Sequence, residues 1–169
     1  TRFGWEARLS YYSTEELTDV VRRSAQQLGV GIVEEGTWEI ARRSRGTPRI
    51  ANRLLRRVRD FAEYEGIPAI TRELAAKALD QLEIDGAGFG AMDRHYLRLL
   101  CDTFKGGPVG VETLAAALSE QRDTIESVYE PFLIQQGFIA RTARGRIALE
   151  AAFTHLGLPM GERSQGSLL

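Results

Sequence analysis

Hydrophobic residues recur at helical spacing along most of the chain, and the clearest pattern starts at Pro48. Thr47 can cap a helix there, and proline suits the first helical position. The apolar positions that return every three or four residues are Ile50, Ala51, Leu54, Leu55, Val58, Phe61 and Ala62. The pattern predicts an amphipathic helix from Pro48 to about Glu65, closed by Gly66, with one apolar face and one arginine-rich face.

Helical patterns also flank this segment. Residues 13–16 form a Ser-Thr-Glu-Glu capping box ahead of an apolar stripe that ends at Gly29. A helix is predicted over 35–43, with Trp38, Ile40 and Ala41 as its apolar residues, and Thr71 caps another. The inward residues of that last helix are Leu74, Ala75, Ala78, Leu79 and Leu82. Together these segments predict a bundle of four helices within roughly seventy residues.

The glycine-rich segment 85–90 separates this bundle from a second periodic region, so we place a domain boundary there. The second region predicts a helix with Cys101 on its apolar side, a turn at 105–108, a short helix over 111–118 and then a third helix. The inward residues of the third helix are Ile125, Val128, Tyr129, Phe132 and Leu133. Pro131 is expected to bend its later half. This order is typical of a helix-turn-helix.

A hairpin signal follows the helix-turn-helix. Residues 138–141 and 146–149 read as strands on either side of a turn. A hairpin in this place predicts a winged helix. Residues 151–156 predict a last short helix, and the polar segment 159–169 is predicted to be disordered.

Composition sets limits on the function without identifying it. The 169 residues carry a formal net charge of −1, although arginines crowd between Arg42 and Arg59. Cys101 is the only cysteine, and neither His95 nor His155 has metal-ligand company, so neither a disulfide framework nor a metal site is predicted. No apolar run reaches the ~18 residues of a membrane span and no signal peptide is evident, which fits a reducing, cytosolic compartment.

Arg49 falls in the first turn of its predicted helix, where backbone N–H groups and the helix dipole already create positive potential. A bound anion would remove the conflict, because a helix N-terminus with an added guanidinium is a good phosphate site. Alternatively, Arg49 extends into water and the helix is simply basic. Spacing alone leaves both interpretations open.

The predicted hairpin is basic. Arg141, Arg144 and Arg146 surround its turn with no acid nearby, an arrangement suited to backbone phosphates. Contacts with backbone phosphates position a protein without reading sequence. A solvated basic turn is the alternative interpretation. The outward residues of the preceding helix are Asp123, Glu126 and Glu130. That face would repel DNA.

The sequence contains no catalytic constellation. No serine or cysteine has a base at plausible spacing, and there is neither a G-x-x-x-x-G-K-S/T phosphate loop nor an apolar strand that ends in paired acids. We therefore assign no catalytic residue and no metal ligand, and we expect this chain to be unable to hydrolyse ATP by itself.

Two sets of residues resemble a known family. The string Gly46-Thr47-Pro48-Arg49 resembles the G-x-x-R box, called sensor 2, in the lid of AAA+ ATPases. The strings 45–60, 106–110 and 130–138 are more specific, and they resemble the RuvB family of bacterial Holliday junction branch-migration motors. The resemblance covers nearly the whole chain and stops at about Pro159.

The resemblance implies a mainly α fold in two domains. Residues 13–84 would form a four-helix AAA+ lid, and residues 85–158 a winged-helix domain with a small β-hairpin. Residues 1–12 would be the tail of the large ATPase domain, whose P-loop part is expected to have been cut away, and 159–169 the disordered tail.

The resemblance also implies roles for individual residues. These are Arg49, Arg2 and Tyr12 for nucleotide binding and Arg141 and Arg146 for DNA binding, to which the charge of the turn adds Arg144. Arg49 would hold the γ-phosphate of ATP and release it after hydrolysis. Residues 142–143 are Thr-Ala where the family usually has Thr-Pro, which would loosen the hairpin without removing either arginine.

By the same resemblance the intact protein would be a homo-hexameric, ATP-dependent DNA helicase of the bacterial cytoplasm. It would drive branch migration of Holliday junctions along duplex DNA, with RuvA, and with RuvC in the resolving complex. ATP and Mg would be held through the absent domain and not by this chain alone. Two alternatives stay open, a stand-alone winged-helix DNA-binding regulator and a protein-interaction module, although a regulator needs neither an acidic outward helix nor a sensor-like box.

Overall fold

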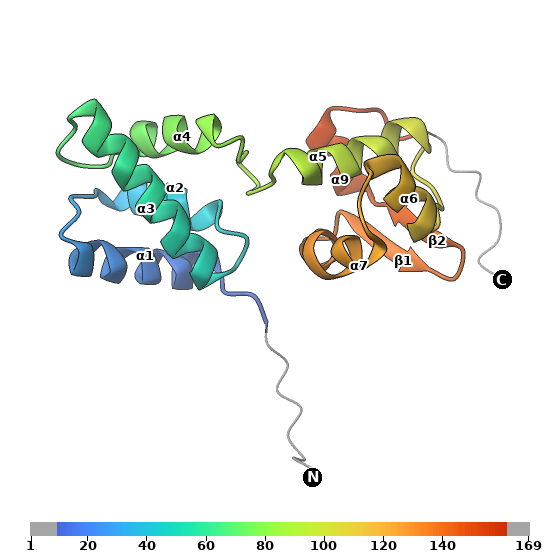
Figure 1. Ribbon diagram of the computed structural model, residues 1–169, viewed down its shortest axis with the longest axis horizontal. Helices are drawn as coiled ribbons and strands as arrows, with labels where there is room; N and C mark the ends of the chain where they lie inside the picture. Colours follow the sequence, from blue (N-terminus) through green and yellow to red (C-terminus); the bar gives the residue numbers. More distant parts are fainter. Residues whose placement is uncertain (1–9, 162–169) are drawn as a thin grey trace, which may run out of the picture. The chain divides into compact units, whose positions relative to one another are not determined.

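The structure, a computed structural model, describes residues 10–161. The described residues fall into two compact units, divided between Gly90 and Ala91. The first unit contains α1 (Thr14–Leu28), α2 (Glu34–Arg42), α3 (Pro48–Glu65) and α4 (Arg72–Gln81), which pack together as a helical bundle (Figure 1). The predicted bundle of four helices is therefore confirmed.

The helix ends of the first unit follow the local sequence, with one exception. Ser13 and Glu16 form the reciprocal capping box, and the Thr71 side chain accepts from the Leu74 backbone N–H. Thr47 occupies the N-cap position of α3 as predicted, but its side chain makes no capping hydrogen bond, because its hydroxyl donates instead to the Arg45 carbonyl at 3.2 Å. Pro48 does occupy the first turn, where no intrahelical N–H is required.

The α3 pattern is also confirmed, since its apolar stripe lies in the core of the first unit. Its buried residues are Ala51, Leu54, Leu55, Val58 and Ala62. They pack with buried residues of the other three helices, which include Leu17, Val21, Ile40, Ala75 and Leu79. The opposite face of α3 carries exposed arginines.

Trp38 does not join this core, contrary to the prediction. Its side chain is 43% exposed, with the guanidinium carbons of Arg42 and Arg72 at 5.3 Å and 5.8 Å from the ring centroid. The next residue, Glu39, is the buried one, with 1% of its surface exposed. It accepts from Arg42 at 2.5 Å and 2.7 Å and from Arg43 at 2.9 Å.

Arg43 connects Glu39 with α4 and with the segment that follows α4. Its Nη1 donates to Asp80 at 2.6 Å and to the Ile84 carbonyl at 2.8 Å. Arg42 likewise donates to the Gly86 carbonyl at 2.6 Å. Glu39 thereby holds α2, the end of α4 and the segment after α4 in one polar cluster.

The second unit begins with α5 (Ala91–Arg98), which continues into the π-helical turn η1 (Leu99–Thr103), and α6 (Val111–Leu118). A third helical stretch follows as α7 (Arg122–Thr124), η2 (Ile125–Tyr129) and α8 (Glu130–Gln135). Then come β1 (Ile139–Thr142), β2 (Gly145–Ala148) and α9 (Glu150–Leu156). Helix, helix and hairpin follow in the predicted order, so the mainly α fold with a small β-hairpin is confirmed.

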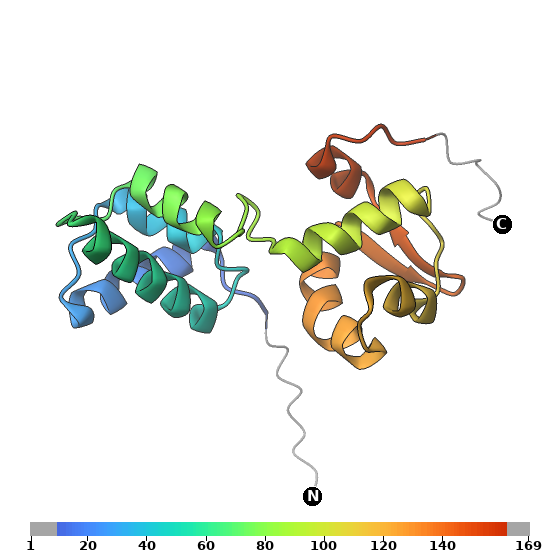
Figure 2. The ribbon, with the colours of Figure 1, turned by 45° about the horizontal axis from the view of Figure 1, so that its top comes forward.

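The hairpin is an antiparallel pair of adjacent strands, seen as two arrows in Figure 2. Val109 bridges to Arg146 of β2 with two backbone hydrogen bonds of 2.9 Å and 2.7 Å. Gly145 makes this approach possible, since a Cβ there would lie 2.4 Å from the Val109 carbonyl oxygen. Thus the loop before α6 covers one edge of the hairpin.

The π-helical turn η2 changes which residues face the core. Val128 was predicted to point inward, yet it is 56% exposed, because a π turn adds a residue and shifts the helical phase. Pro131 follows directly and has no N–H for the regular ladder. The same shift brings Glu130 inward, where its side chain is fully buried.

The Glu39 cluster predicts how the first unit responds to acid. Burial pushes the pKa of Glu39 up, but hydrogen bonds from Arg42 and Arg43 outweigh it and bring the pKa below its ordinary value of 4.5. A carboxyl group with a lowered folded-state pKa contributes stability above its unfolded pKa and loses it as the pH falls. We expect Glu39→Gln to lower the free energy of unfolding by about 3 kcal/mol at neutral pH, a difference that shrinks below about pH 4.5.

Urea unfolding at several pH values measures this difference. Glu73→Gln removes an exposed acid from α4 and serves as the matched control, for which little change is expected. If wild type and Glu39→Gln kept a constant difference down to low pH, the Glu39 cluster would not be the acid-sensitive contact.

Candidate nucleic-acid and nucleotide interfaces

The hairpin places its arginines in two different environments. Arg141 and Arg146 are directly opposite each other in the β1–β2 register, so their side chains lie on the same face of the hairpin. Arg144 lies in the turn between the strands and is exposed. The structure thus brings the three predicted DNA-binding residues together on one hairpin.

The expectation that no acid lies near these arginines is wrong. Arg141 donates to Glu130 Oε2 through Nε at 3.0 Å and Nη2 at 2.7 Å. Arg146 donates to Glu130 Oε1 through Nε at 2.8 Å and to Glu126 through Nη2 at 2.9 Å. The acids come from the helical stretch before the hairpin, and periodicity alone had placed them on its outer face.

The acidic face of that helical stretch is only in part the open surface that was predicted, because Asp123 is exposed but the other two acids are not. Glu130 is completely buried, and Glu126 pairs with both Arg122 and Arg146. Arg122 also pairs with Glu112 of α6 at 3.0 Å. Acids and arginines therefore alternate in one continuous chain of ion pairs, whose members in order are Glu112, Arg122, Glu126, Arg146, Glu130 and Arg141.

This ion-pair chain controls the ionisation of its members. The hydrogen bond from Arg122 is the main cause that lowers the pKa of Glu126, and the bond from Glu130 is the main cause that raises the pKa of Arg146. Burial, and then the nearby Glu130 carboxylate, raise the pKa of Tyr96, whose hydroxyl donates to Glu130 Oε1 at 2.9 Å. Glu126, Arg146 and Tyr96 therefore keep their ordinary charge near neutral pH.

Exposure separates the three hairpin arginines. The Arg141 side chain is 46% exposed, whereas that of Arg146 is 12% exposed. Arg144 has no ion pair with any residue in the described range 10–161. Arg144 and the outer edge of Arg141 are therefore the cationic groups of the hairpin that a phosphate can reach.

The start of α3 forms the second candidate interface. Gly46 adopts φ +66°, and an added Cβ would lie 2.6 Å from the Tyr11 Cβ, so the turn requires glycine. The Tyr12 backbone N–H donates to the Gly46 carbonyl at 2.8 Å. This bond brings two residues predicted to bind nucleotide, Tyr12 and Arg49, to the same turn. Arg2, the third, lies outside the described residues.

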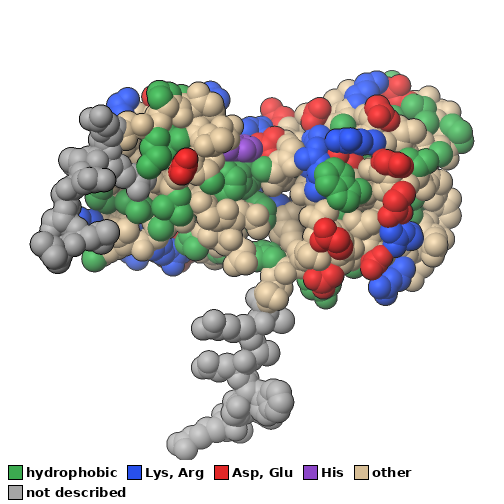
Figure 3. Space-filling view, turned by 180° about the vertical axis from the view of Figure 1, so that it is seen from behind, with side chains coloured by type: hydrophobic (Ala, Val, Ile, Leu, Met, Phe, Trp, Pro, Cys, Tyr) green, Lys and Arg blue, Asp and Glu red, His purple; other side chains and the backbone are tan. Residues whose placement is uncertain are grey.

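Arg49 is exposed in the first turn of α3, and no acid in the part of the chain that the structure describes pairs with it. Arg53, Arg56 and Arg57 share this condition farther along the helix. Elsewhere on the first unit, acidic and basic side chains intermix on the face shown in Figure 3. The α3 N-terminus therefore keeps positive potential that its neighbours do not cancel.

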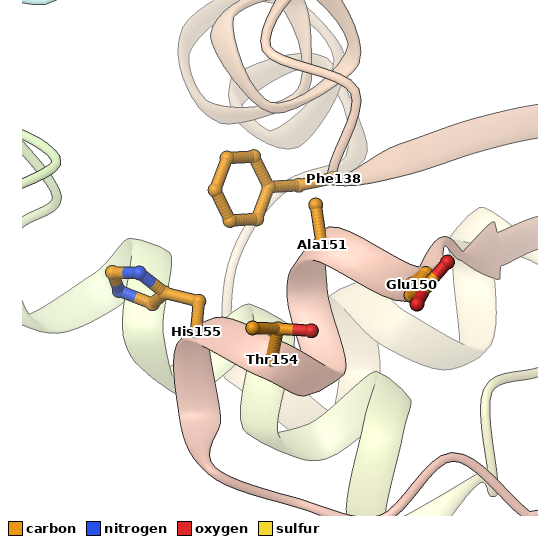
Figure 4. A pocket seen from close by; sticks show the side chains of 5 residues that line it. All are labelled: Phe138, Glu150, Ala151, Thr154 and His155. Carbon is orange, nitrogen blue, oxygen red and sulfur yellow. The ribbon is translucent and has the colours of Figure 1, made fainter.

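No metal site is evident among residues 10–161. No group of three or more His, Cys, Asp or Glu side chains there could hold a metal ion, and no helix of that range is long and apolar enough to cross a membrane. A shallow depression of about 480 Å³ lies beside α9 (Figure 4). The rings of His155 and Phe138 pack edge to face in it, with their centroids 5.6 Å apart.

Comparisons with known proteins identify both units. The model of the RuvB AAA lid domain matches residues 12–85, and that of the RuvB C-terminal winged helix domain matches residues 86–157. The solved RuvB Holliday junction branch migration motor of Thermotoga maritima is 42% identical over 89% of this chain and 51% of that chain, with a TM-score of 0.86. A mutant of the same protein is 43% identical over 93% of this chain and 52% of that chain, with a TM-score of 0.89. This chain thus spans about half the length of the solved structures it matches.

The ion-pair chain predicts unequal costs for two arginine substitutions. Arg146→Ala should lower the free energy of unfolding by about 2 kcal/mol, because Glu130 loses two charge-assisted hydrogen bonds and Glu126 loses one. Arg144→Ala, at an exposed position without an ion pair in the described range, should stay within about 0.5 kcal/mol of wild type. Urea denaturation of the two variants measures both values, and equal stabilities would show that the ion pairs of Arg146 contribute nothing.

Proposed function

The chain belongs to the RuvB family, and from that premise we propose that it is the nucleotide-sensing and DNA-contacting part of a motor that drives Holliday junction branch migration. The observation that carries the proposal is the pair of matches to the RuvB lid and winged-helix domains, in that order along the chain. The solved Thermotoga relative is described as a Holliday junction branch migration motor, and we propose the same activity for the protein to which this chain belongs.

In this proposal the start of α3 senses ATP. Arg49 would contact the γ-phosphate beside the free N–H groups of the first turn of α3. The guanidinium of Arg49 is unfavourable at this positive end of the helix dipole, and a bound anion removes that cost. Tyr12, which is tied to the same turn, and Arg2 would complete the nucleotide contacts. Because ATP offers this contact and ADP does not, the lid would prefer different positions in the two states.

The hairpin would contact the DNA backbone. Arg144 and the outer edge of Arg141 present guanidinium groups suited to phosphate, while Arg146 stays mostly enclosed by Glu126 and Glu130. Phosphate contacts carry no sequence information by themselves. A motor that moves along any duplex requires contacts of this kind.

The whole motor requires more than this segment. We propose that ATP and Mg are bound through an ATPase domain outside this chain, with no cofactor held by the segment alone. The assembled protein would be a homo-hexamer in the bacterial cytoplasm that works on Holliday junctions and duplex DNA with RuvA, and with RuvC in the resolving complex. This segment would convert nucleotide state into movement of DNA.

The sensor assignment can be tested in a protein that joins this segment to its ATPase domain. Arg49→Ala should leave folding intact and abolish nucleotide-dependent branch migration, because the γ-phosphate loses its contact with the lid. Arg53→Ala removes an exposed arginine one turn farther along α3 and is the matched control, for which activity should persist. Unchanged ATPase activity and branch migration in Arg49→Ala would refute the assignment.

The hairpin assignment can be tested with this chain. Arg144→Ala should reduce the slope of log affinity against log salt for duplex DNA by about 0.9, because one phosphate contact is lost. The reduction should be similar for duplexes of unrelated sequence. Arg98→Ala, at an exposed position of α5, is the control and should leave the slope unchanged. A slope unaffected by Arg144→Ala would remove the turn from the DNA interface.

A further inference from the structure

Glu130 stands at the centre of the hairpin's polar contacts although its side chain is fully buried. Oε1 accepts from the Tyr96 hydroxyl at 2.9 Å and from Arg146 Nε at 2.8 Å. Oε2 accepts from Arg141 Nε at 3.0 Å and Nη2 at 2.7 Å, and from Arg146 Nη2 at 3.2 Å. Tyr96 is itself completely buried, so the carboxylate is fixed from the core on one side and holds the hairpin arginines on the other.

These contacts fix the direction of the Arg141 side chain. Both of its bonds to Glu130 use the Nε–Nη2 edge of the planar guanidinium, and Nη1 has no hydrogen bond to any residue in the range 10–161. The side chain is nevertheless 46% exposed. Holding one edge of a rigid plane determines where the remaining N–H groups point, and it removes rotamer freedom that a phosphate contact would otherwise have to restrict.

We propose that Glu130 is a positioning residue for DNA, and that its buried carboxylate holds Arg141 in the orientation that binds a backbone phosphate. The inference rests on the proposed function, in which the hairpin contacts DNA. It assigns to an acid, the residue type that DNA normally repels, a favourable effect on DNA binding.

Net charge alone gives the opposite expectation, so the direction of the change in DNA affinity tests the inference. If Glu130 only neutralised the hairpin, its removal would make the surface more positive and strengthen DNA binding at low salt. If Glu130 positions Arg141, the same change frees the guanidinium and weakens binding despite the added positive charge.

The experiment compares Glu130→Gln with wild type by fluorescence anisotropy of a labelled duplex of unrelated sequence. We expect affinity to fall by about tenfold, the factor that corresponds to one charge-assisted hydrogen bond. Asp123→Asn makes the same change in charge at an exposed position of α7 and is the matched control. It should bind as tightly as wild type or more tightly. An affinity increase in Glu130→Gln like that of Asp123→Asn would overturn the proposal.

Two further variants guard against a general loss of structure. Glu130→Asp keeps the charge but withdraws the carboxylate by one methylene, so positioning predicts weaker binding and neutralisation predicts wild-type binding. Tyr96→Phe changes no charge and removes one of the two donors to Oε1, so it should weaken binding by a smaller factor. Near-ultraviolet circular dichroism confirms folding at the assay temperature. Wild-type affinity in both variants would overturn the proposal.

The Arg141→Ala background separates failure of this inference from failure of the proposed function. If Glu130 acts through Arg141, Glu130→Gln should no longer weaken binding once Arg141 is alanine. A tenfold effect of Glu130→Gln that persisted in this background would overturn the proposal while leaving hairpin binding in place. If Arg141→Ala and Arg144→Ala alone leave affinity and salt slope unchanged, the hairpin does not contact DNA, and the proposed function fails with the inference.

Discussion

A carboxylate that is shut off from water must be surrounded by donors and positive charge, and this constraint organises the second unit around Glu130. Three side chains satisfy it: Tyr96 from the core, and Arg141 and Arg146 from the hairpin. The helix, the core and the hairpin are therefore fixed to one another by a single group. The first unit uses the same solution, since buried Glu39 holds Arg42 and Arg43 and, through them, the segment after α4.

The buried acids neutralise part of the positive charge that the arginines bring to the chain. The hairpin is not a loose cluster of cations, because two of its arginines end a chain of alternating ion pairs that starts on α6. Its positive potential is limited to Arg144 and the outer edge of Arg141. In the proposed function, this surface would contact a phosphate backbone through those two groups. The start of α3 differs, because Arg49 has no acidic partner in the described part of the chain and remains open to an anion.

Sequence reasoning predicted the features that depend on neighbouring residues. The stripe of α3, the Ser13 and Thr71 caps and the order of helices and hairpin all follow from local spacing and local hydrogen bonds. It failed where partners lie far apart in the chain or where helical phase changes. The burial of Glu130 depends on Tyr96, distant in sequence, and the exposure of Val128 depends on a π-helical turn that periodicity does not reveal. The contact of Glu130 with Arg141 and Arg146 could not be predicted from the sequence, because it depends on how the helix and the hairpin pack together.

The most direct test of the hairpin account is to follow the arginine side-chain Nε–H resonances by nuclear magnetic resonance while duplex DNA is added. The account predicts that the resonances of Arg141 and Arg144 shift or broaden, whereas that of Arg146, enclosed by Glu130 and Glu126, stays where it is in the unbound protein. If Arg146 responded as strongly as Arg141, or if no hairpin arginine responded, the ion-pair chain would not determine which groups meet DNA.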